Sequence, residues 1–388
     1  MKNRLVVIGS AVAASIGLCM AVAPAAMAQP LKVTVACGDV AALLTAVSDA
    51  NDNADGGTIT LAKDCAYRFT EGFGGSDSAL PAITGKVKIV GHNSTLIRSA
   101  TDGLPLFRII SVSEGGELLL KGVTVTGGHA EVYGGGIENA GTLRLEDSKV
   151  AGNRAGAEGG GIHNVGGTAT LVDSDVLTNV ATSADGTATG DGGGISNEAD
   201  STLTIKKSTI AGNAADTDGG GIENEGSLTV EHGLIANNEA REGNGGGIDN
   251  LGTAKLKYTK VVENWAGQNG GGINNGEEAT LETNESAIAD NRAGNDGGGL
   301  NNAGTATLKK TKVESNQAGH DGGGINNVAA GDGATELTLE HSTVAENRAA
   351  NVGGGINNGE GATVTLTDSK VVKNLPTNCA GTVPGCTT

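Results

Sequence analysis

The sequence predicts an all-β protein, a single-stranded, right-handed parallel β-helix with a short N-terminal capping helix. Three observations indicate this fold class. First, one motif occurs nine times between residues 134 and 358, at intervals of 25 to 33 residues. It consists of Gly-Gly-Gly followed by Ile or Leu, one variable residue and Asn. Second, each interval contains short runs in which apolar and polar residues alternate. Third, aromatic residues make up only 2% of the chain, and a narrow solenoid interior has little room for rings.

The chain begins with the pattern of a secretory signal peptide, which we assign to residues 1–28. Lys2 and Arg4 form a basic start, an apolar stretch follows, and Ala26 to Ala28 form a small-x-small cleavage site. We therefore expect export to a secreted, extracellular or cell-surface location. No later apolar run approaches the length of a membrane span, so no membrane insertion is expected.

The mature chain is expected to be strongly acidic. The full sequence has a formal net charge of −18, and removal of Lys2 and Arg4 leaves 24 basic against 44 acidic residues, a net charge of −20. A field of this sign repels phosphates and carboxylates. It argues against nucleic acid as a partner, and against anionic polysaccharide unless a cation mediates the contact.

Residues 29–115 precede the glycine triplets and are assigned to an N-terminal cap and the first coils. Between Asp39 and Ala50, apolar residues recur at helical spacing, and Asp39 is a suitable N-cap. We expect a short amphipathic helix there that covers the end of the solenoid, because an open β-helix end is an exposed sheet edge. Alternation predicts strands at Thr58–Leu61, Lys86–Val90, Phe107–Val112 and Glu117–Val125.

Residues 116–375 are assigned to the β-helix repeats. The unit from Gly134 to Asn153 contains three runs of period two, separated by Gly or Asn, and no helical period. Each strand should pair with its equivalent one coil away, about 4.8 Å along the axis. The usual handedness of parallel connections predicts right-handed winding. The triplet glycines should permit positive φ and close backbone approach at one corner.

Stacked coils should align equivalent residues in columns, and two asparagine columns are expected to be structural, because side-chain amides can bond to the coils above and below. The first column is Asn139, Asn164, Asn197, Asn224, Asn250, Asn275, Asn302, Asn327 and Asn358. The second column is Asn153, Asn179, Asn213, Asn238, Asn264, Asn291, Asn316, Asn347 and Asn374.

Two intervals are longer than the others and predict outward loops. Their inserted residues are Thr182–Thr189 and Ala329–Thr335. Residues 376–388 are assigned to a C-terminal tail that covers the other end of the helix.

The mature chain has four cysteines, which lie in one pair near each end. An exported chain with an even number of cysteines is expected to form disulfides, and four cysteines allow three pairings. Sequence proximity favours Cys37–Cys65 and Cys379–Cys386.

Gly-Gly-Gly-Ile followed by Val/Ile-x-x-Asn resembles the repeat of the chlamydial polymorphic membrane proteins, which pairs Gly-Gly-Ala-Ile with Phe-x-x-Asn. The chlamydial Phe is replaced here by residues such as Val150, Ile210 and Val313. More closely, the chain is similar to secreted bacterial right-handed parallel β-helix proteins of the pectate-lyase-like superfamily, over residues 37 to 388. The resemblance implies a surface or extracellular role, often adhesion, in a family where many members have no known activity.

Pectate lyases of this superfamily use aspartates around calcium and a basic catalytic residue, so acidic columns near the triplets are of interest. Glu223 and Asp249 should stack one strand spacing apart, with Asp218 at the preceding turn. Such close carboxylates either shift a pKa or share a cation. We weigh Ca²⁺ at these three residues against solvated charges and favour the latter. The variable motif position, here called the outer column, is Glu138, His163, Ser196, Glu223, Asp249, Asn274, Asn301, Asn326 and Asn357.

The coil of Tyr258 and Trp265 departs from the repeat pattern, because these are the only aromatic residues after position 133. An exposed ring with nearby cations is a platform for carbohydrate or a protein partner. The alternative, which we favour, is that the lysines of this coil pair with Glu282 and Glu231 on neighbouring coils. The candidate ligand residues are Tyr258, Trp265, Lys255 and Lys257.

The regular repeats favour a non-catalytic exported protein that presents an extended acidic surface for binding or adhesion, with carbohydrate or a surface protein as ligand. The alternative is a polysaccharide lyase or hydrolase, which should break the repeats with acids and a basic residue in one cleft. No nucleophile–base pair can be named, so no catalytic residue is assigned. Outward threonines suggest ice binding as a third alternative, but Arg144, Lys255 and Glu282 interrupt the array.

Overall fold

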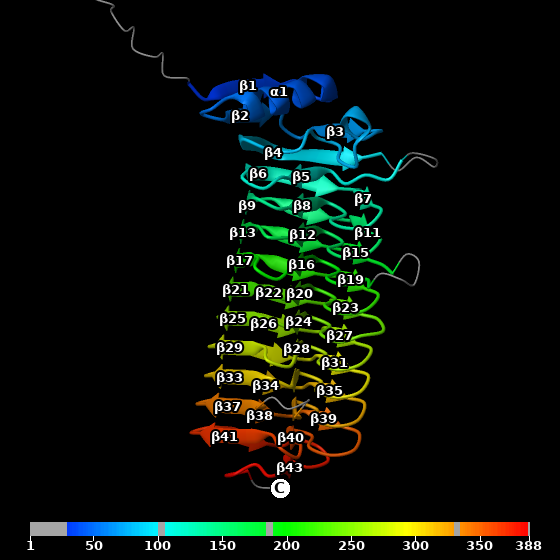
Figure 1. Ribbon diagram of the computed structural model, residues 1–388. Coiled ribbons are helices and arrows are strands. Elements are labelled where there is room, and N and C mark those ends of the chain that lie inside the picture. Colours follow the sequence, from blue (N-terminus) through cyan, green and yellow to red (C-terminus); the bar gives the residue numbers. More distant parts are fainter. Residues whose placement is uncertain (1–28, 100–104, 184–188, 330–333, 387–388) are drawn as a thin grey trace, which may run out of the picture.

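The computed structural model describes residues 29–99, 105–183, 189–329 and 334–386, which form a parallel β-solenoid of about 13 turns (Figure 1). The predicted fold class is therefore confirmed, whereas right-handed winding stays a prediction. The predicted signal peptide lies outside the described residues, as do residues 184–188 and 330–333 of the two predicted loops. No helix among the described residues is both long and apolar enough to cross a membrane.

The N-terminal region begins with short strands and continues with two long ones. Strand β4 extends beyond the predicted Val90, because its backbone continues through a register shift between Val90 and Ser94. Strands β4 and β6 each span both strand columns of the coils that follow, which joins those columns into one sheet. The elements are β1 (Leu31–Val35), α1 (Val40–Asp52), β2 (Gly57–Leu61), β3 (Ala66–Phe69), a 3-10 turn (Phe73–Gly75), β4 (Lys86–Arg98), β5 (Ile110–Val112) and β6 (Glu117–Thr126).

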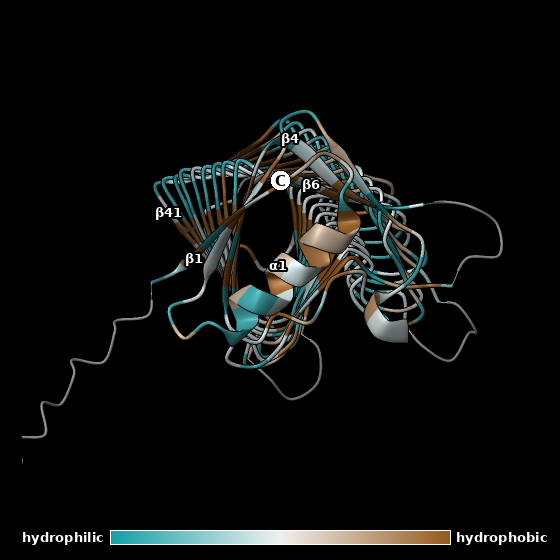
Figure 2. Cartoon of the chain, turned by 90° about the horizontal axis from the view of Figure 1, so that it is seen from above, coloured by the Kyte–Doolittle hydropathy of each residue, from teal (hydrophilic) through white to brown (hydrophobic). Residues whose placement is uncertain are grey.

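Helix α1 lies across the N-terminal end of the stack, as predicted (Figure 2). The carboxylate of Asp39 accepts the backbone N–H of Ala42 at 2.9 Å and so caps the helix. The buried residues of its inner face are Leu43, Ala46, Val47 and Ala50. Burial of this face covers the apolar end of the interior.

A complete coil contains four short strands, whereas the alternation pattern predicts three. The additional strand has two residues and directly follows the second ladder asparagine. Two residues are too few to show an alternation, which is why the sequence did not reveal it.

The first two strands of each coil belong to a 23-stranded sheet. The first strands are β9 (Thr142–Glu146), β13 (Thr168–Val172), β17 (Thr202–Lys206), β21 (Ser227–Glu231), β25 (Thr253–Lys257), β29 (Thr280–Asn284), β33 (Thr305–Lys309), β37 (Glu336–Glu340) and β41 (Thr363–Thr367). The second strands are β10 (Lys149–Ala151), β14 (Asp175–Leu177), β18 (Thr209–Ala211), β22 (Leu234–Ala236), β26 (Lys260–Val262), β30 (Ala287–Ala289), β34 (Lys312–Glu314), β38 (Thr343–Ala345) and β42 (Lys370–Val372).

The other two strands of each coil form separate sheets of nine and eleven strands. The nine-stranded sheet contains β7 (His129–Ala130), β11 (Arg154–Ala155), β15 (Val180–Ala181), β19 (Ala214–Ala215), β23 (Glu239–Ala240), β27 (Trp265–Ala266), β31 (Arg292–Ala293), β35 (Gln317–Ala318) and β39 (Arg348–Ala349). The eleven-stranded sheet contains β5, β8 (Ile137–Asn139), β12 (Ile162–Asn164), β16 (Ile195–Asn197), β20 (Ile222–Asn224), β24 (Ile248–Asn250), β28 (Ile273–Asn275), β32 (Leu300–Asn302), β36 (Ile325–Asn327), β40 (Ile356–Asn358) and β43 (Cys379–Gly381).

The glycine triplets perform two different tasks at the corner between the nine- and eleven-stranded sheets. The first glycine of each triplet, such as Gly270, has a positive φ (65° there). The middle glycine, Gly271 in that coil, allows close packing: a Cβ on it would clash with the backbone carbonyls of Arg292 and Gly298. Both roles agree with the sequence prediction.

The two asparagine columns form the predicted ladders. In the first, each side-chain amide donates to the amide oxygen of the next coil, for example Asn224 to Asn250 at 2.7 Å. In the second, an example is Asn238 to Asn264 at 3.0 Å. These hydrogen bonds satisfy polar groups that stacking buries.

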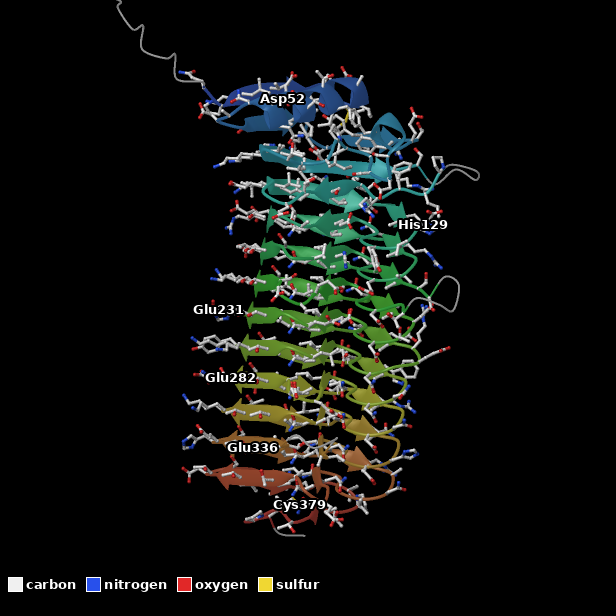
Figure 3. The ribbon with its side chains drawn as sticks, viewed as in Figure 1. Asp52, His129, Glu231, Glu282, Glu336 and Cys379 are labelled. Carbon is white, nitrogen blue, oxygen red and sulfur yellow. A yellow bond between two sulfur atoms is a disulfide. The ribbon has the colours of Figure 1, made fainter. Side chains whose placement is uncertain are left out.

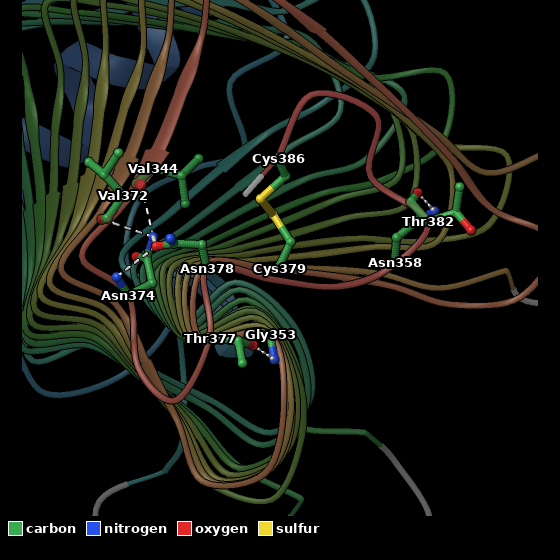
Figure 4. The surroundings of a disulfide bond; sticks show 10 residues. All are labelled: Val344, Gly353, Asn358, Val372, Asn374, Thr377, Asn378, Cys379, Thr382 and Cys386. Carbon is green, nitrogen blue, oxygen red and sulfur yellow. Dashed lines mark hydrogen bonds between the residues drawn. A yellow bond between two sulfur atoms is a disulfide. The ribbon is translucent and has the colours of Figure 1, made fainter. Parts of the chain in front are cut away.

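Both ladders end on the C-terminal tail (Figure 4). The side chain of Asn378 accepts from the backbone N–H of Asn374 at 3.1 Å, in place of a further ladder residue. The amide of Asn358 donates to the carbonyl of Thr382 at 2.8 Å. Strand β43 pairs with β40 and starts at Cys379, which is bonded to Cys386. The second disulfide is Cys37–Cys65, so both pairings favoured by the sequence are present.

Candidate functional site

Tyr258 lies at the turn between β25 and β26, where its backbone φ is 52° and 39% of its surface is exposed. Its ring stacks on His232 of the preceding coil, with centroids 4.7 Å apart and an interplanar angle of 16°. The Nζ atom of Lys257 lies 5.0 Å from the ring centroid, which is cation–π geometry. The ring is therefore held in place by neighbours but remains accessible to a ligand.

Lysines lie on both sides of Tyr258. Lys255 and Lys257 line a shallow depression over β25 and β29. Lys260 and Lys312 line a second depression, together with Tyr258 itself. We define the Tyr258 patch as Tyr258, His232, Lys255, Lys257, Lys260 and Lys312.

The predicted neutralisation of these lysines is only partly confirmed. Lys255 pairs with Glu282 at 3.8 Å, as expected. Glu231, the expected partner of Lys257, instead pairs with Lys206 at 3.9 Å. Glu231 and Glu282 project from one edge of the solenoid (Figure 3). Among the described residues, the patch lysines that have no carboxylate oxygen within 4.0 Å are Lys257, Lys260 and Lys312.

Trp265 does not belong to the same surface as Tyr258. It begins β27 in the nine-stranded sheet, where it is half-buried and in register with Glu239 and Arg292. Tyr258 borders the 23-stranded sheet. The alternation pattern could not reveal that a corner at Asn264 separates the two rings.

Glu223 and Asp249 are direct register partners in β20 and β24, as predicted. The expectation that they are solvated is wrong, because their surfaces are only 7% and 3% exposed. The triplet loop explains this burial, since it bends back over the outward face of the eleven-stranded sheet. A Cβ on Gly219, for example, would lie 2.9 Å from the Cα atom of Glu223.

Burial changes the ionisation of Asp249. Desolvation raises its pKa to about 7, and repulsion from Asp218 acts in the same direction. A hydrogen bond from the Asn274 amide, 2.6 Å long, opposes the shift without cancelling it.

Glu223 and Asp218 are affected in the same way. Burial raises the pKa of Glu223 well above its usual range, with added repulsion from Asp191, and one of its carboxyl oxygens lies 3.1 Å from the Ser196 hydroxyl. Burial also raises the pKa of Asp218, which accepts the side-chain amide of Asn244 at 3.1 Å. These contacts hold Asp218 in the turn that precedes the triplet.

The predicted calcium residues do not converge. A metal site requires several acidic, His or Cys side chains whose ligand atoms lie close together. Among the described residues, one group of three or more such side chains has its ligand atoms within 4.8 Å of one another. Glu223, Asp249 and Asp218 do not belong to that group. Calcium binding at those three residues stays a prediction.

The converging group is Glu158, His163 and Glu198, which sequence reasoning missed. Nε2 of His163 lies 3.2 Å from Glu198 Oε1 and 3.7 Å from Glu158 Oε2. The His163 ring stacks on Tyr133, with centroids 4.8 Å apart and an interplanar angle of 13°. The Ser196 hydroxyl donates to Glu198 at 2.8 Å. Neighbours from three coils thus fix the ring and one carboxylate.

In the absence of an added ion, this group behaves as an ion pair. Desolvation lowers the pKa of His163, but hydrogen bonds to both glutamates outweigh it and raise that pKa to about 9. The hydrogen bond to His163 lowers the pKa of Glu198 to about 2. The contact of His163 with Glu158 lowers the pKa of Glu158. Burial and the neighbouring Glu198 outweigh this contact, so the pKa of Glu158 is raised.

One sequence signal could have revealed this group. His163 is the only histidine in the outer column. Glu158 immediately precedes the triplet of the same coil, and Glu198 follows the ladder asparagine of the next coil. The missing information was that the triplet loop brings the position before the triplet against the outer column.

Comparison with known families finds no family model that matches the chain, and comparison with curated protein sequences finds no similar protein.

Proposed function

We propose that the protein is an exported, non-catalytic β-helix that binds acidic polysaccharide at the Tyr258 patch. The observation that carries this proposal is an exposed ring, stacked on His232, beside lysines that lack a carboxylate partner among the described residues. A ring face packs against the C–H groups of a sugar, while ammonium groups pair with its carboxylates. The ligand class is the one that the sequence resemblance to pectate-lyase-like proteins implies.

Export is supported by the predicted signal peptide and by the disulfides, which form and persist in oxidising compartments. We propose a secreted or cell-surface location.

The overall negative charge does not exclude an acidic ligand at this patch. At physiological ionic strength the screening length is about 8 Å, so the charges nearest a bound group dominate the field there. The two depressions beside Tyr258 are lined by five lysines and three glutamates, so the local balance is positive. The general expectation of repulsion therefore applies to the rest of the surface.

Absence of catalysis is proposed because the two acids whose pKa values are raised most, Glu223 and Asp249, are inaccessible to a polymer. Glu223 and Asp249 lie beneath the triplet loops, and neither lines the depressions beside Tyr258. General acid catalysis requires hydrogen-bond reach to the scissile bond.

The test is titration of the protein with oligogalacturonate and, as a matched neutral ligand, its methyl ester. We expect saturable binding of the acidic form, weakened by salt, and roughly tenfold weaker binding of Tyr258→Ala, as loss of ring and cation–π contacts predicts. Trp265→Ala is the control, because this ring lies in another sheet. Equal binding of the two ligands, or an unchanged isotherm for Tyr258→Ala, would exclude the patch.

A second measurement tests the absence of catalysis. Incubation with polygalacturonate and Ca²⁺ should release neither unsaturated nor reducing ends. Turnover that is lost in Asp249→Asn would establish the lyase or hydrolase alternative instead.

A further inference from the structure

Glu158, His163 and Glu198 interrupt the outer column with a nitrogen ligand. The register partners of His163 are Glu138 and Ser196, and farther along the column the residues are acids and asparagines. Only at this level does an imidazole face two carboxylates among the described residues.

The distances suit a tetrahedral metal ion. Zn²⁺ binds nitrogen and carboxylate oxygen at about 2.0–2.2 Å, so two ligand atoms at tetrahedral positions are separated by roughly 3.4 Å. Nε2 of His163 lies 3.2 Å from Glu198 Oε1 and 3.7 Å from Glu158 Oε2, on either side of that value. The ligand atoms can therefore close around an ion with small side-chain movements.

The local charge also favours a dication. Ser196 donates to Glu198 at 2.8 Å and lies 3.1 Å from a carboxylate oxygen of Glu223, but its hydroxyl has one proton to donate. The carboxyl groups of Glu158 and Glu198 both face one imidazole, whose single positive charge cannot balance two ionised carboxylates. A dication bound at Nε2 would balance two carboxylates without protonation of the ring.

The ligand set selects the class of metal. Ca²⁺ and Mg²⁺ prefer oxygen ligands only, whereas imidazole with carboxylates suits zinc and neighbouring transition metals. The side chains of Glu158 and Glu198 are 22% and 25% exposed, which leaves an entry path and a fourth position for water.

The second nitrogen of His163 limits the expected affinity. Nδ1 is buried and has no hydrogen-bond partner within the described part of the chain. Metal-binding histidines usually donate this N–H to an acceptor, and loss of that contact typically weakens binding by about 10–100-fold. Stacking on Tyr133 orients the ring here instead.

We infer that Glu158, His163 and Glu198 bind one divalent transition-metal ion of the Zn²⁺ class, which joins two successive coils and is independent of the Tyr258 patch. The site supplies three protein ligands and one solvent position. Its role is to fasten the second and third triplet coils to each other.

The test is calorimetric titration of the intact, chelator-treated protein with Zn²⁺, and with Co²⁺ for its visible spectrum. We expect one ion per chain, a rise in the thermal unfolding midpoint, and the intense Co²⁺ bands of four-coordinate geometry. His163→Asn should weaken binding at least tenfold and remove those bands. Asparagine already occupies this column at four other levels, so the variant should retain the fold.

Two further variants make the result decisive. Glu198→Gln should weaken binding by a similar factor and provides a second readout if His163→Asn unfolds. His341→Asn is the matched control, because His341 is exposed and lies 3.6 Å from the single carboxylate of Asp368. Absence of saturable binding by the wild type, or wild-type affinity in both His163→Asn and Glu198→Gln, would overturn the inference.

Discussion

The two halves of the outer column have the same backbone but different chemistry. From Asn274 to Asn357 every member is an asparagine whose side-chain amide donates to the residue one coil earlier, ending on Asp249. From Glu138 to Asp249 the members are acids, a histidine and a serine. An amide both donates and accepts, so a neutral ladder satisfies itself. Ionised carboxylates only accept, so a run of them cannot satisfy itself and each needs a donor or a cation as partner.

The partners of these ionisable residues differ from level to level. Arg108 pairs with Glu138 at 2.6 Å, and His163 lies between Glu158 and Glu198. Asp249 accepts the neutral amide of Asn274 in place of a cation, and its pKa is raised. The comparison shows that the fold requires a hydrogen-bonding residue in this column but no ionisable one.

The largest effect is expected at the glycine corner, which both halves share. Gly271→Val would place side-chain atoms against the carbonyls of Arg292 and Gly298, and should lower the free energy of unfolding by more than about 3 kcal/mol. Gly193→Val, in the charged half, should cost a similar amount because Gly220 and Ala214 lie equally close. Denaturant unfolding followed by circular dichroism measures both.

The control for the glycine variants is Gly166→Val. Gly166 has a positive φ of 65° but open space around its Cβ position, so it reports backbone strain without a clash. A loss at Gly166 as large as that at Gly271 would show that strain, not packing, determines the effect.

The second prediction extends the neutral ladder by one level. Asp249→Asn should raise the free energy of unfolding at pH 8 by on the order of 2–4 kcal/mol. The pKa of Asp249 is about 7 in the folded protein against a reference of 3.8, with Asp218, Asp191 and Glu225 as the repelling charges. The folded state therefore holds an extra proton, and wild-type stability falls as the pH rises from about 4 to 7.

The measurement is unfolding by denaturant at pH 4 and pH 8. The advantage of Asp249→Asn should be present at pH 8 and reduced to roughly 0.5 kcal/mol at pH 4, where the carboxyl group is neutral in the folded state and about half ionised in the unfolded state. An advantage of equal size at both pH values would refute the ionisation argument.

The general course of the solenoid could be predicted from the sequence because its determinants repeat. The nine triplets, the two asparagine columns and inward apolar residues such as Ile222 recur in every coil. An assignment that is ambiguous in one coil is therefore resolved by comparison with the next coil. Both disulfides and the helix capped by Asp39 were also predicted, since cysteine proximity and capping are local signals.

The burial and convergence of polar groups could not be predicted in the same way. Period-two alternation correctly placed Glu223 and Asp249 outside the core, but it contains no information on what covers the outer face. The contact of His163 with Glu158 and Glu198 depends on how far the triplet loop bends back. The separation of Trp265 from Tyr258 likewise depends on a corner angle.

The third prediction introduces charge into the neutral half. Asn301→Asp should lower the free energy of unfolding at pH 8 by about 1–2 kcal/mol, because a carboxylate cannot donate to Asn274 as the amide does at 2.8 Å. The loss should be smaller than the gain from Asp249→Asn, since Asn301 is half-buried and water can solvate its replacement.

Recovery at low pH checks this prediction. Below about pH 3, the introduced carboxyl group is mostly neutral and can donate a hydrogen bond to Asn274 again, so Asn301→Asp should regain most of its stability relative to the wild type. Persistence of the full loss in acid would attribute it to shape instead of charge.

The smallest effect is expected where a ladder can exchange its partners for water. Asn326→Ala removes a donor to Asn301 and an acceptor for Asn357, but both neighbours are half-buried, so the loss should be about 1 kcal/mol. The adjacent Asn327→Ala is the matched comparison, because it leaves the Oδ1 atom of the buried Asn358 without its 2.7 Å donor. That loss should be two- to threefold larger, since an unsatisfied buried group costs about 1–3 kcal/mol. Equal losses in the free energy of unfolding would mean that the asparagines of the outer column are as shielded from water as those of the first asparagine ladder. Burial of the charged residues in the outer column would then destabilise the folded state by a correspondingly larger amount.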